Sequence, residues 1–290
     1  MLKPTQSPFQ RTRRRIVILA FDGAQMLDIA GPGDVFSLVN RFEPNLHYDV
    51  TCISAEGGPV RMSNGLSLMT EPFRNIRIAS IDTLVVAGAE KSGLLKAMND
   101  DQLQIWVCKA AKSVRRLVSV CVGSFALAHW GLLNGRRATS HWSVVDLMQK
   151  RFSRVQVNRT ALYVQDGSLW TAGGVTTGID MSLAMVEADS NRLVAGRVAG
   201  ALVMTIRRIG NQSQHSVQLR AQTGRYAKLV DWIEANLNQN LDISALALRA
   251  GESERSFCRR FVAEVGETPA HFVETVRLCV ARQALEGGGT

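Results

Sequence analysis

The feature that most constrains the fold is an alternation, from residue 14 to about residue 190, between short apolar runs and longer amphipathic segments. The apolar runs, which are rich in branched aliphatic side chains, lie at residues 16–20, 48–53, 83–86 and 117–120. The segments with helical spacing lie at about residues 28–40, 100–114, 123–130 and 143–151. Short, nearly continuous apolar runs are typical of strands that are buried on both faces of a parallel sheet. The alternation therefore predicts an α/β fold with a doubly wound parallel sheet.

A polar stretch interrupts this pattern and predicts a domain boundary. Residues 210–216 are rich in Asn, Gln and Ser and have no apolar periodicity, which is typical of a linker. Beyond this stretch the apolar residues recur at helical spacing. We therefore expect a basic arm at residues 1–14, an α/β domain at 15–209, a linker at 210–222 and a smaller all-α domain at 223–290.

The composition limits the class of protein further. The 290 residues are 46% hydrophobic and 20% charged, which is enough apolar content for two cores. The five cysteines have no CxxC spacing and the apolar run at residues 16–21 is too short for a membrane span or a signal peptide, so we expect thiols in a cytoplasmic protein without a membrane partner. The histidines lack metal-ligand spacing, so we expect no metal and no cofactor. We expect Trp130 and Trp142 to belong to the core.

The charge balance makes an anionic partner plausible without locating it. The formal net charge is +9, and Lys and Arg side chains gain by releasing counterions from phosphate. Residues 225–286, however, contain eight basic and nine acidic residues, so the predicted all-α domain is not basic overall. The excess of basic residues lies upstream, in the N-terminal arm and at Arg192, Arg197, Arg207, Arg208 and Arg220.

The all-α segment contains the pattern of a helix-turn-helix. Asp242 is suited to cap a helix over residues 243–250, and Gly251 is suited to end it. Ser253 is suited to cap a second helix, which runs to about residue 265. In a DNA-binding helix-turn-helix, the second helix enters the major groove with its N-terminal residues near the base edges.

The second helix has an apolar face and a polar face. Phe257 and Phe261 are four residues apart and must face inward, so that Arg255 and Arg259 form an outward stripe that can contact guanine or phosphate. The candidate DNA-binding residues are Ser253, Arg255, Ser256, Arg259 and Arg260. The alternative from the spacing alone is an ordinary helical hairpin with a solvated charged face.

This segment resembles the AraC/XylS family of regulators. The resemblance covers about residues 226–285 and lies in the motif Ser-x-Arg-x-Phe-x-Arg-Arg-Phe at 253–261, followed by Gly-x-Thr-Pro at 266–269. Members of that family carry a second helix-turn-helix after a long helix, here 269–285, and this chain stops at Thr290. Either the chain is a truncated version of a longer protein, or it binds double-stranded DNA with one reading helix per protomer and needs a homodimer for strong specific binding.

A cysteine occupies a sharp turn in the α/β domain. Residues 119–125 run directly from a buried strand into a helix, which places Cys121 at an elbow with the positive end of a helix beneath its sulfur. A thiol there is expected to have a depressed pKa and to be reactive. The alternative is a buried, inert cysteine.

The α/β domain resembles the DJ-1/PfpI superfamily, and in particular the GlxA-type regulators that join such a domain to an AraC-type one. Three motifs carry the resemblance: residues 26–32; Cys121 with residues 131–142; and residues 171–174 leading to 178–180. The resemblance implies a flavodoxin-like sheet. It also implies that Asp28 lies beside Cys121, and that Gly88 and Ala89 lie in a loop that offers backbone N–H groups to a ligand.

The same resemblance argues against catalysis. Enzymes of the superfamily place a His or a Thr directly after the cysteine, whereas this chain has Val122, and a cysteine without a base is a poor catalyst of acyl chemistry. His141 could approach Cys121 in space. We therefore interpret Asp28, Gly88, Ala89, Cys121, Val122 and His141 as a ligand pocket.

The resulting hypothesis is a transcription regulator that senses a small effector. By resemblance the effector is nitrogenous, such as an amino acid, a betaine or a related quaternary amine, and the protein dimerises through its α/β domain, where residues 184–187 and 197–208 are candidates. One alternative is a cysteine-dependent hydrolase or hydratase of small amides, isocyanides or carbonyl compounds. Another is a redox sensor in which Cys121 is oxidised to a sulfenic acid.

Overall fold

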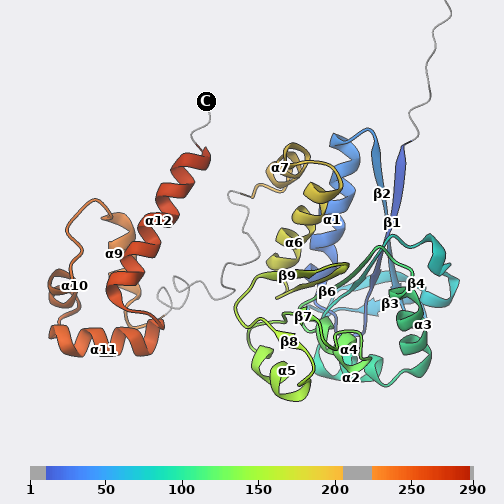
Figure 1. Ribbon diagram of the computed structural model, residues 1–290, viewed down its shortest axis with the longest axis horizontal. Helices are drawn as coiled ribbons and strands as arrows, with labels where there is room; N and C mark the ends of the chain where they lie inside the picture. The colour runs from blue at the N-terminus through green and yellow to red at the C-terminus, as the bar shows by residue number, and fades with distance from the viewer. Residues whose placement is uncertain (1–10, 205–223, 288–290) are drawn as a thin grey trace, which may run out of the picture. The chain divides into compact units, whose positions relative to one another are not determined.

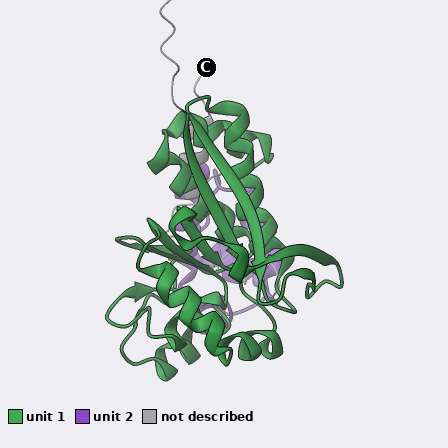
Figure 2. Ribbon diagram, turned by 90° about the vertical axis from the view of Figure 1, so that its right-hand side faces the viewer, with its two compact units in different colours: residues 1–214 green, residues 215–290 purple. Residues whose placement is uncertain are grey.

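A computed structural model describes residues 11–204 and 224–287 of the chain. The chain divides into two compact units, residues 1–214 and residues 215–290, which Figure 2 colours separately. Each unit is described by itself. The predicted linker, 210–222, lies outside the described residues.

The first unit is built on one eight-stranded sheet with the order β3-β4-β2-β1-β5-β6-β10-β9. The strands from β4 to β10 in this order are parallel to their neighbours, and the outer pairs β3/β4 and β9/β10 are antiparallel. Their bounds are β1 Thr12–Leu19, β2 Leu46–Ser54, β3 Gly58–Arg61, β4 Ser67–Pro72, β5 Thr83–Val86, β6 Arg116–Val120, β9 Tyr163–Asp166 and β10 Leu169–Ala172. A second, two-stranded sheet pairs β7 Arg137–Ala138 with β8 Gln156–Val157.

Helices cover both faces of the large sheet (Figure 1). Ile16 and Ile18 of β1 face a core that includes α1 and α6, whereas Val17 and Leu19 face a core that includes α2, α3 and α4. The helices are α1 Met26–Phe42, α2 Lys91–Met98, α3 Asp101–Ala111, α4 Gly123–His129, α5 Val145–Arg151, α6 Thr176–Asp189 and α7 Arg192–Ala201, with 3₁₀ turns at Phe73–Asn75 and Ile78–Ser80. This arrangement confirms the predicted doubly wound, flavodoxin-like fold.

Several details differ from the sequence-based expectations. β1 begins at Thr12, so the end of the predicted basic arm belongs to the sheet. Trp130 is buried as expected, but Trp142 is 47% exposed, because it lies in the loop before α5 rather than beside a buried strand. Of the dimerisation candidates at 197–208, residues 197–201 belong to α7, which ends at Ala201, and residues 205–208 lie outside the described residues.

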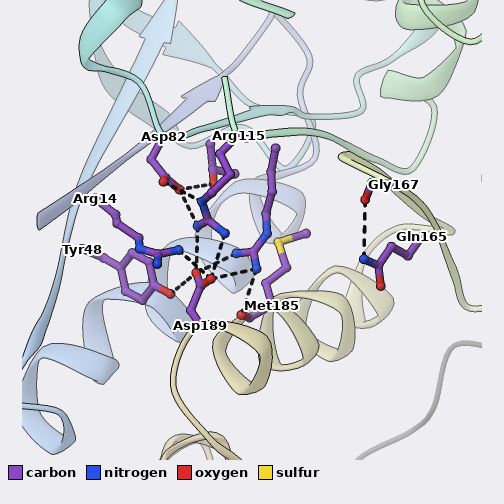
Figure 3. Close-up of polar contacts among 10 residues, drawn as sticks. Arg14, Tyr48, Asp82, Arg115, Gln165, Gly167, Met185 and Asp189 are labelled. Atoms are coloured by element: carbon purple, nitrogen blue, oxygen red, sulfur yellow. Dashed lines mark hydrogen bonds and ion pairs between the residues drawn. The ribbon is translucent and has the colours of Figure 1, made fainter. Parts of the chain in front are cut away.

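Three arginines converge on one carboxylate at the amino ends of the strands (Figure 3). Asp189, the last residue of α6, lies 2.6 Å from Arg14, 2.8 Å from Arg115 and 2.7 Å from Arg116, and its side chain is 3% exposed. The Tyr48 hydroxyl also donates to Asp189 at 2.6 Å. Burial alone would raise the pKa of Asp189, but the hydrogen bonds from Arg115 and Tyr48 and the charge of Arg116 hold it below its usual value. This cluster, the Asp189 cluster, ties the end of α6 to β1, β2 and β6.

The second unit consists of helices around one aromatic core. The helices are α9 Ala227–Ala235, α10 Ile243–Ala250, α11 Glu254–Val265 and α12 Pro269–Gly287. Asp242 caps α10 by accepting a hydrogen bond from the Ala245 N–H at 2.8 Å. Gly251 and Gly266 end α10 and α11 with left-handed backbone angles, as the sequence predicts. No described helix of either unit is long and apolar enough to cross a membrane.

Replacing Asp189 with Asn should destabilise the first unit strongly. The amide cannot balance three nearby guanidinium groups, one of which, Arg116, is only 7% exposed, so we expect a loss of about 3–5 kcal/mol in the free energy of unfolding, measured by urea denaturation at neutral pH. Because the pKa of Asp189 is lowered in the folded protein, the stabilisation that its carboxylate provides is present above a pH of about 4 and is lost as the pH falls below that value. Asp49→Asn removes an exposed partner of Arg13 and should cost less than about 1 kcal/mol. Equal losses for the two variants would contradict the prediction.

Candidate functional site

Cys121 lies at the elbow that the sequence predicts, directly after β6 and before α4. Its backbone has φ 57°, a left-handed conformation that is strained for a residue with a side chain. The Cys121 N–H donates to the Ala172 carbonyl at 2.9 Å, which continues the pairing of β6 with β10 into the turn. The pairing therefore fixes the position of the thiol relative to the ends of β6 and β10.

Two glycines pack closely against Cys121. A Cβ atom placed on Gly88 would lie 2.8 Å from Cys121 Cβ and 2.8 Å from Asp28 Oδ2. A Cβ atom on Gly174, which has φ +105°, would lie 2.5 Å from Cys121 Cβ. Gly88 was predicted from the sequence to belong to the site, whereas Gly174 was not, although it lies in one of the motifs that carry the family resemblance. Any side chain at either glycine would displace the elbow.

Asp28 of α1 lies beside the thiol and is fully buried. Its Oδ1 accepts a hydrogen bond from the Val175 N–H at 2.7 Å. Its Oδ2 is next to the Gly88 amide and the Cys121 thiol but has no well-aligned hydrogen bond to a described residue. Burial raises the pKa of Asp28 to about 6, with the hydrogen bond from Val175 and the nearby Gly88 amide and Cys121 thiol opposing the rise. Above that pH the site contains a buried negative charge.

The expectation that the elbow depresses the pKa of Cys121 is wrong. Burial and the charge of Asp28 raise the pKa of the thiol to about 12. The Val122 N–H at the start of α4 acts in the opposite direction, but its effect is smaller. At neutral pH the site therefore pairs a protonated thiol with a carboxylate.

The remaining predicted pocket residues are only partly buried. Ala89, Val122 and His141 are half-buried, as is Cys121 itself. Ser140 donates to the Cys121 carbonyl at 3.2 Å, which brings the loop that carries His141 to the elbow. His141 Nδ1 is hydrogen-bonded to Ser143 Oγ at 2.7 Å.

A hollow of about 500 Å³ lies elsewhere in the first unit. Its lining consists of Arg137, Gln149, Gln156, Val157, Asn158, Arg159 and Val164. None of the predicted pocket residues contributes to it. Among the residues that the structure describes, no group of three or more His, Cys, Asp or Glu side chains is arranged to hold a metal ion.

In the second unit, α11 has the two faces that the sequence predicts. Phe257 and Phe261 are fully buried, whereas Arg255 and Arg259 are exposed and form no ion pair with a described residue. Ser253 occupies the position before α11, but its hydroxyl bonds to Ser256 Oγ at 3.1 Å instead of capping a backbone N–H. Two guanidinium groups on one outward stripe are available to an anionic partner.

Arg260 differs from the other two arginines of α11. Its guanidinium lies 3.3 Å from Glu252, whose carboxylate also accepts from the Tyr226 hydroxyl and pairs with Arg225. Arg260 was predicted from the sequence to bind DNA, whereas Glu252, Arg225 and Tyr226 were not identified. The available signal for Glu252 was a charged residue in the turn, between the glycine that ends α10 and the serine that precedes α11.

The comparisons with known proteins agree with this arrangement. The model of the DJ-1/PfpI family matches residues 14–188. The chain is similar to the HTH-type transcriptional regulator GbdR of Pseudomonas aeruginosa, with 27% identity over 98% of this chain and 77% of that protein. It is also similar to an isonitrile hydratase of Pseudomonas putida, with 34% identity over 60% of this chain and 71% of that protein. A solved ThiJ/PfpI family protein of Pseudomonas syringae shares the fold, with a TM-score of 0.61, 23% identity and coverage of 79% of this chain and 93% of that one.

The raised pKa of Cys121 predicts slow alkylation. With a pKa of about 12, the thiolate fraction at neutral pH is so small that iodoacetamide should modify Cys121 about a hundredfold or more slowly than an unhindered thiol, measured by mass spectrometry of the peptide. Asp28→Asn removes the negative charge and should accelerate the reaction about tenfold. Asp34→Asn, an exposed change on the same helix, should leave the rate unchanged. Rapid alkylation of the unmodified protein at neutral pH would contradict the raised pKa.

Proposed function

The chain belongs to the DJ-1/PfpI family, and we propose that it is a DNA-binding transcription regulator whose first unit senses a small, nitrogenous metabolite without catalysis. The observation that carries the proposal is α11, which buries Phe257 and Phe261 and leaves Arg255 and Arg259 free to face DNA. The similarity to a named regulator extends over both units, whereas the similarity to the hydratase covers 60% of the chain.

The helix-turn-helix geometry supports contact with the major groove. Ser253, Arg255 and Ser256 lie at the N-terminal end of α11, the part of a reading helix that approaches base edges. Arg259 lies one turn further along, where it can contact a base or a phosphate. A dimer that places two copies of α11 on successive half-sites would add base contacts, so the proposal includes binding to double-stranded DNA as a homodimer in the cytoplasm.

The site at Cys121 supports ligand binding more than catalysis. A thiol with a pKa near 12 is a weak nucleophile at neutral pH, and the following residue, Val122, supplies no base. The buried Asp28 carboxylate favours a ligand with a positive charge or an N–H donor and disfavours an anion. Asp28, Cys121, Gly88, Ala89 and His141 are therefore the proposed effector contacts.

A hydratase is the second candidate because the Asp28 carboxylate lies beside the Cys121 thiol and could accept its proton as a general base. Turnover of a small isocyanide or amide that Cys121→Ala abolishes, in a protein that does not bind DNA, would favour it. The redox-sensor hypothesis requires a thiolate, and the raised pKa of Cys121 argues against that hypothesis.

Alanine substitutions on α11 should weaken DNA binding. Arg255→Ala and Arg259→Ala together are expected to reduce affinity for promoter DNA next to the gene by about 10- to 100-fold. They should also lower the salt dependence by about one counterion for each phosphate that an arginine no longer neutralises. The measurement is fluorescence anisotropy over a salt series. Arg61→Ala and Arg74→Ala together, which remove two exposed charges from the first unit, are the matched control and should have little effect. Unchanged binding by the double variant would refute the assignment of α11.

A nitrogenous effector should stabilise the first unit. We expect a betaine or an α-amino acid to raise the melting temperature in a thermal-shift screen, whereas a carboxylic acid of similar size without the nitrogen should not, because a ligand that binds only the native state stabilises it by mass action. Asp28→Asn should remove the preference for the cationic ligand. Equal shifts from the amine-free acid would contradict the proposed class.

A further inference from the structure

A buried carboxylate lies in the turn of the helix-turn-helix. Glu252 stands between Gly251 and Ser253, and its side chain is 4% exposed. Glu252 Oε1 accepts a hydrogen bond from the Tyr226 hydroxyl at 3.1 Å and lies 3.1 Å from Arg225 Nη2. Glu252 Oε2 lies 3.3 Å from Arg260 Nη1. One carboxylate therefore joins residues that precede α9 to a residue in the middle of α11.

The partners of Glu252 explain why its charge is tolerated in this position. A buried carboxylate is costly unless charges and donors surround it, and here two guanidinium groups and one hydroxyl do so. Arg225 and Arg260 are 54% and 47% exposed, so both could turn toward solvent if the carboxylate were removed. Burial, together with the hydrogen bond to Glu252 and its charge, raises the pKa of Tyr226 to about 12, which keeps that hydroxyl a donor.

Tyr226 adds a second connection to α11. Its ring is 3% exposed and lies 5.6 Å from the ring of Phe257 and 5.2 Å from the ring of Phe261. These phenylalanines are the inward residues of α11, on the side opposite Arg255 and Arg259. Arg225 and Tyr226 are also among the first described residues after the predicted linker. The chain that enters the second unit thus contacts α11 through an aromatic cluster and through Glu252.

We propose that Glu252 is a positioning residue that couples the chain entering the second unit to the reading helix α11. A displacement of the backbone before Arg225 moves the partners of Glu252 and, through it, Arg260 and the turn that starts α11. Arg260 is then held at Glu252 as part of this coupling, instead of facing DNA with Arg255 and Arg259. The inference rests on the proposed function, because α11 is a reading helix only if the protein binds DNA.

The coupling can be tested in the full chain by hydrogen exchange of the peptides that cover residues 253–265. Arg225→Gln changes an exposed residue outside α11, yet it should accelerate exchange in these peptides by about two- to fivefold because one ion pair of Glu252 is removed. Glu252→Gln should accelerate it by about tenfold or more, since all three partners lose the charge. Lys228→Gln and Asp231→Asn are exposed changes of the same charge on α9 and should leave exchange unchanged.

Binding to a random-sequence duplex over a salt series gives a readout that a purely structural role would not produce. Glu252→Gln removes the carboxylate that pairs with Arg260 and Arg225, so both arginines become available to phosphate. Its affinity for the duplex should therefore be about threefold or more above that of Asp231→Asn, which removes one negative charge as well. Either of two results would overturn the coupling. One is unchanged hydrogen exchange in residues 253–265 of the Arg225→Gln and Glu252→Gln variants, and the other is equal duplex affinity for Glu252→Gln and Asp231→Asn. If neither the unmodified protein nor the variants bind any duplex, the proposed function fails, while the exchange result still decides whether Glu252 couples Arg225 to α11.

Discussion

The burial of both faces of one parallel sheet is the constraint on which the first unit depends. Because β1, β5, β6 and β10 run in the same direction between two cores, their carboxyl ends meet at one edge of the sheet. Cys121 follows β6, Gly88 follows β5 and Gly174 follows β10, so the topology itself assembles the elbow and its close neighbours. The amino ends meet at the opposite edge, where the Asp189 cluster closes the sheet against α6.

The sequence predicted best where local signals agreed with the final environment. The strand at 83–86 and the helix at 243–250 have the predicted bounds, because the first is a buried run and the second has an Asp cap and a terminal glycine. β3, β4 and β9 were not predicted, since most of their residues are exposed or only half-buried. β10 was also missed, although it is as short and as fully buried as β5. The closeness of Asp28 and Gly88 to Cys121 was expected, but the direction of the shift in the thiol pKa was not. The helix end lowers that pKa by less than burial and the charge of Asp28 raise it. Val175, which has φ 51° and donates to Asp28, carried no sequence signal.

The two units use the same electrostatic device at different places. In each, one acidic side chain that is less than 5% exposed is surrounded by more guanidinium groups than its charge balances, and a tyrosine hydroxyl completes the set. Such a cluster has a net positive charge, so its guanidinium groups would lose their shared partner if the central carboxylate were replaced by an amide. Asp189 connects α6 to the sheet through its ion pairs with Arg14 and Arg116. Glu252 connects the turn of the helix-turn-helix to Arg225 and Tyr226, which precede α9.

The exposure of Trp142 has a spectroscopic consequence. Its indole is 47% exposed, and it lies two residues from Ser140, whose hydroxyl contacts the Cys121 carbonyl, whereas Trp106, Trp130 and Trp170 are at most 9% exposed. An indole near water emits at longer wavelength than a buried one. The long-wavelength fluorescence of the first unit therefore originates largely at the loop beside the elbow, which makes Trp142 an intrinsic fluorescent probe of the conformation of that loop.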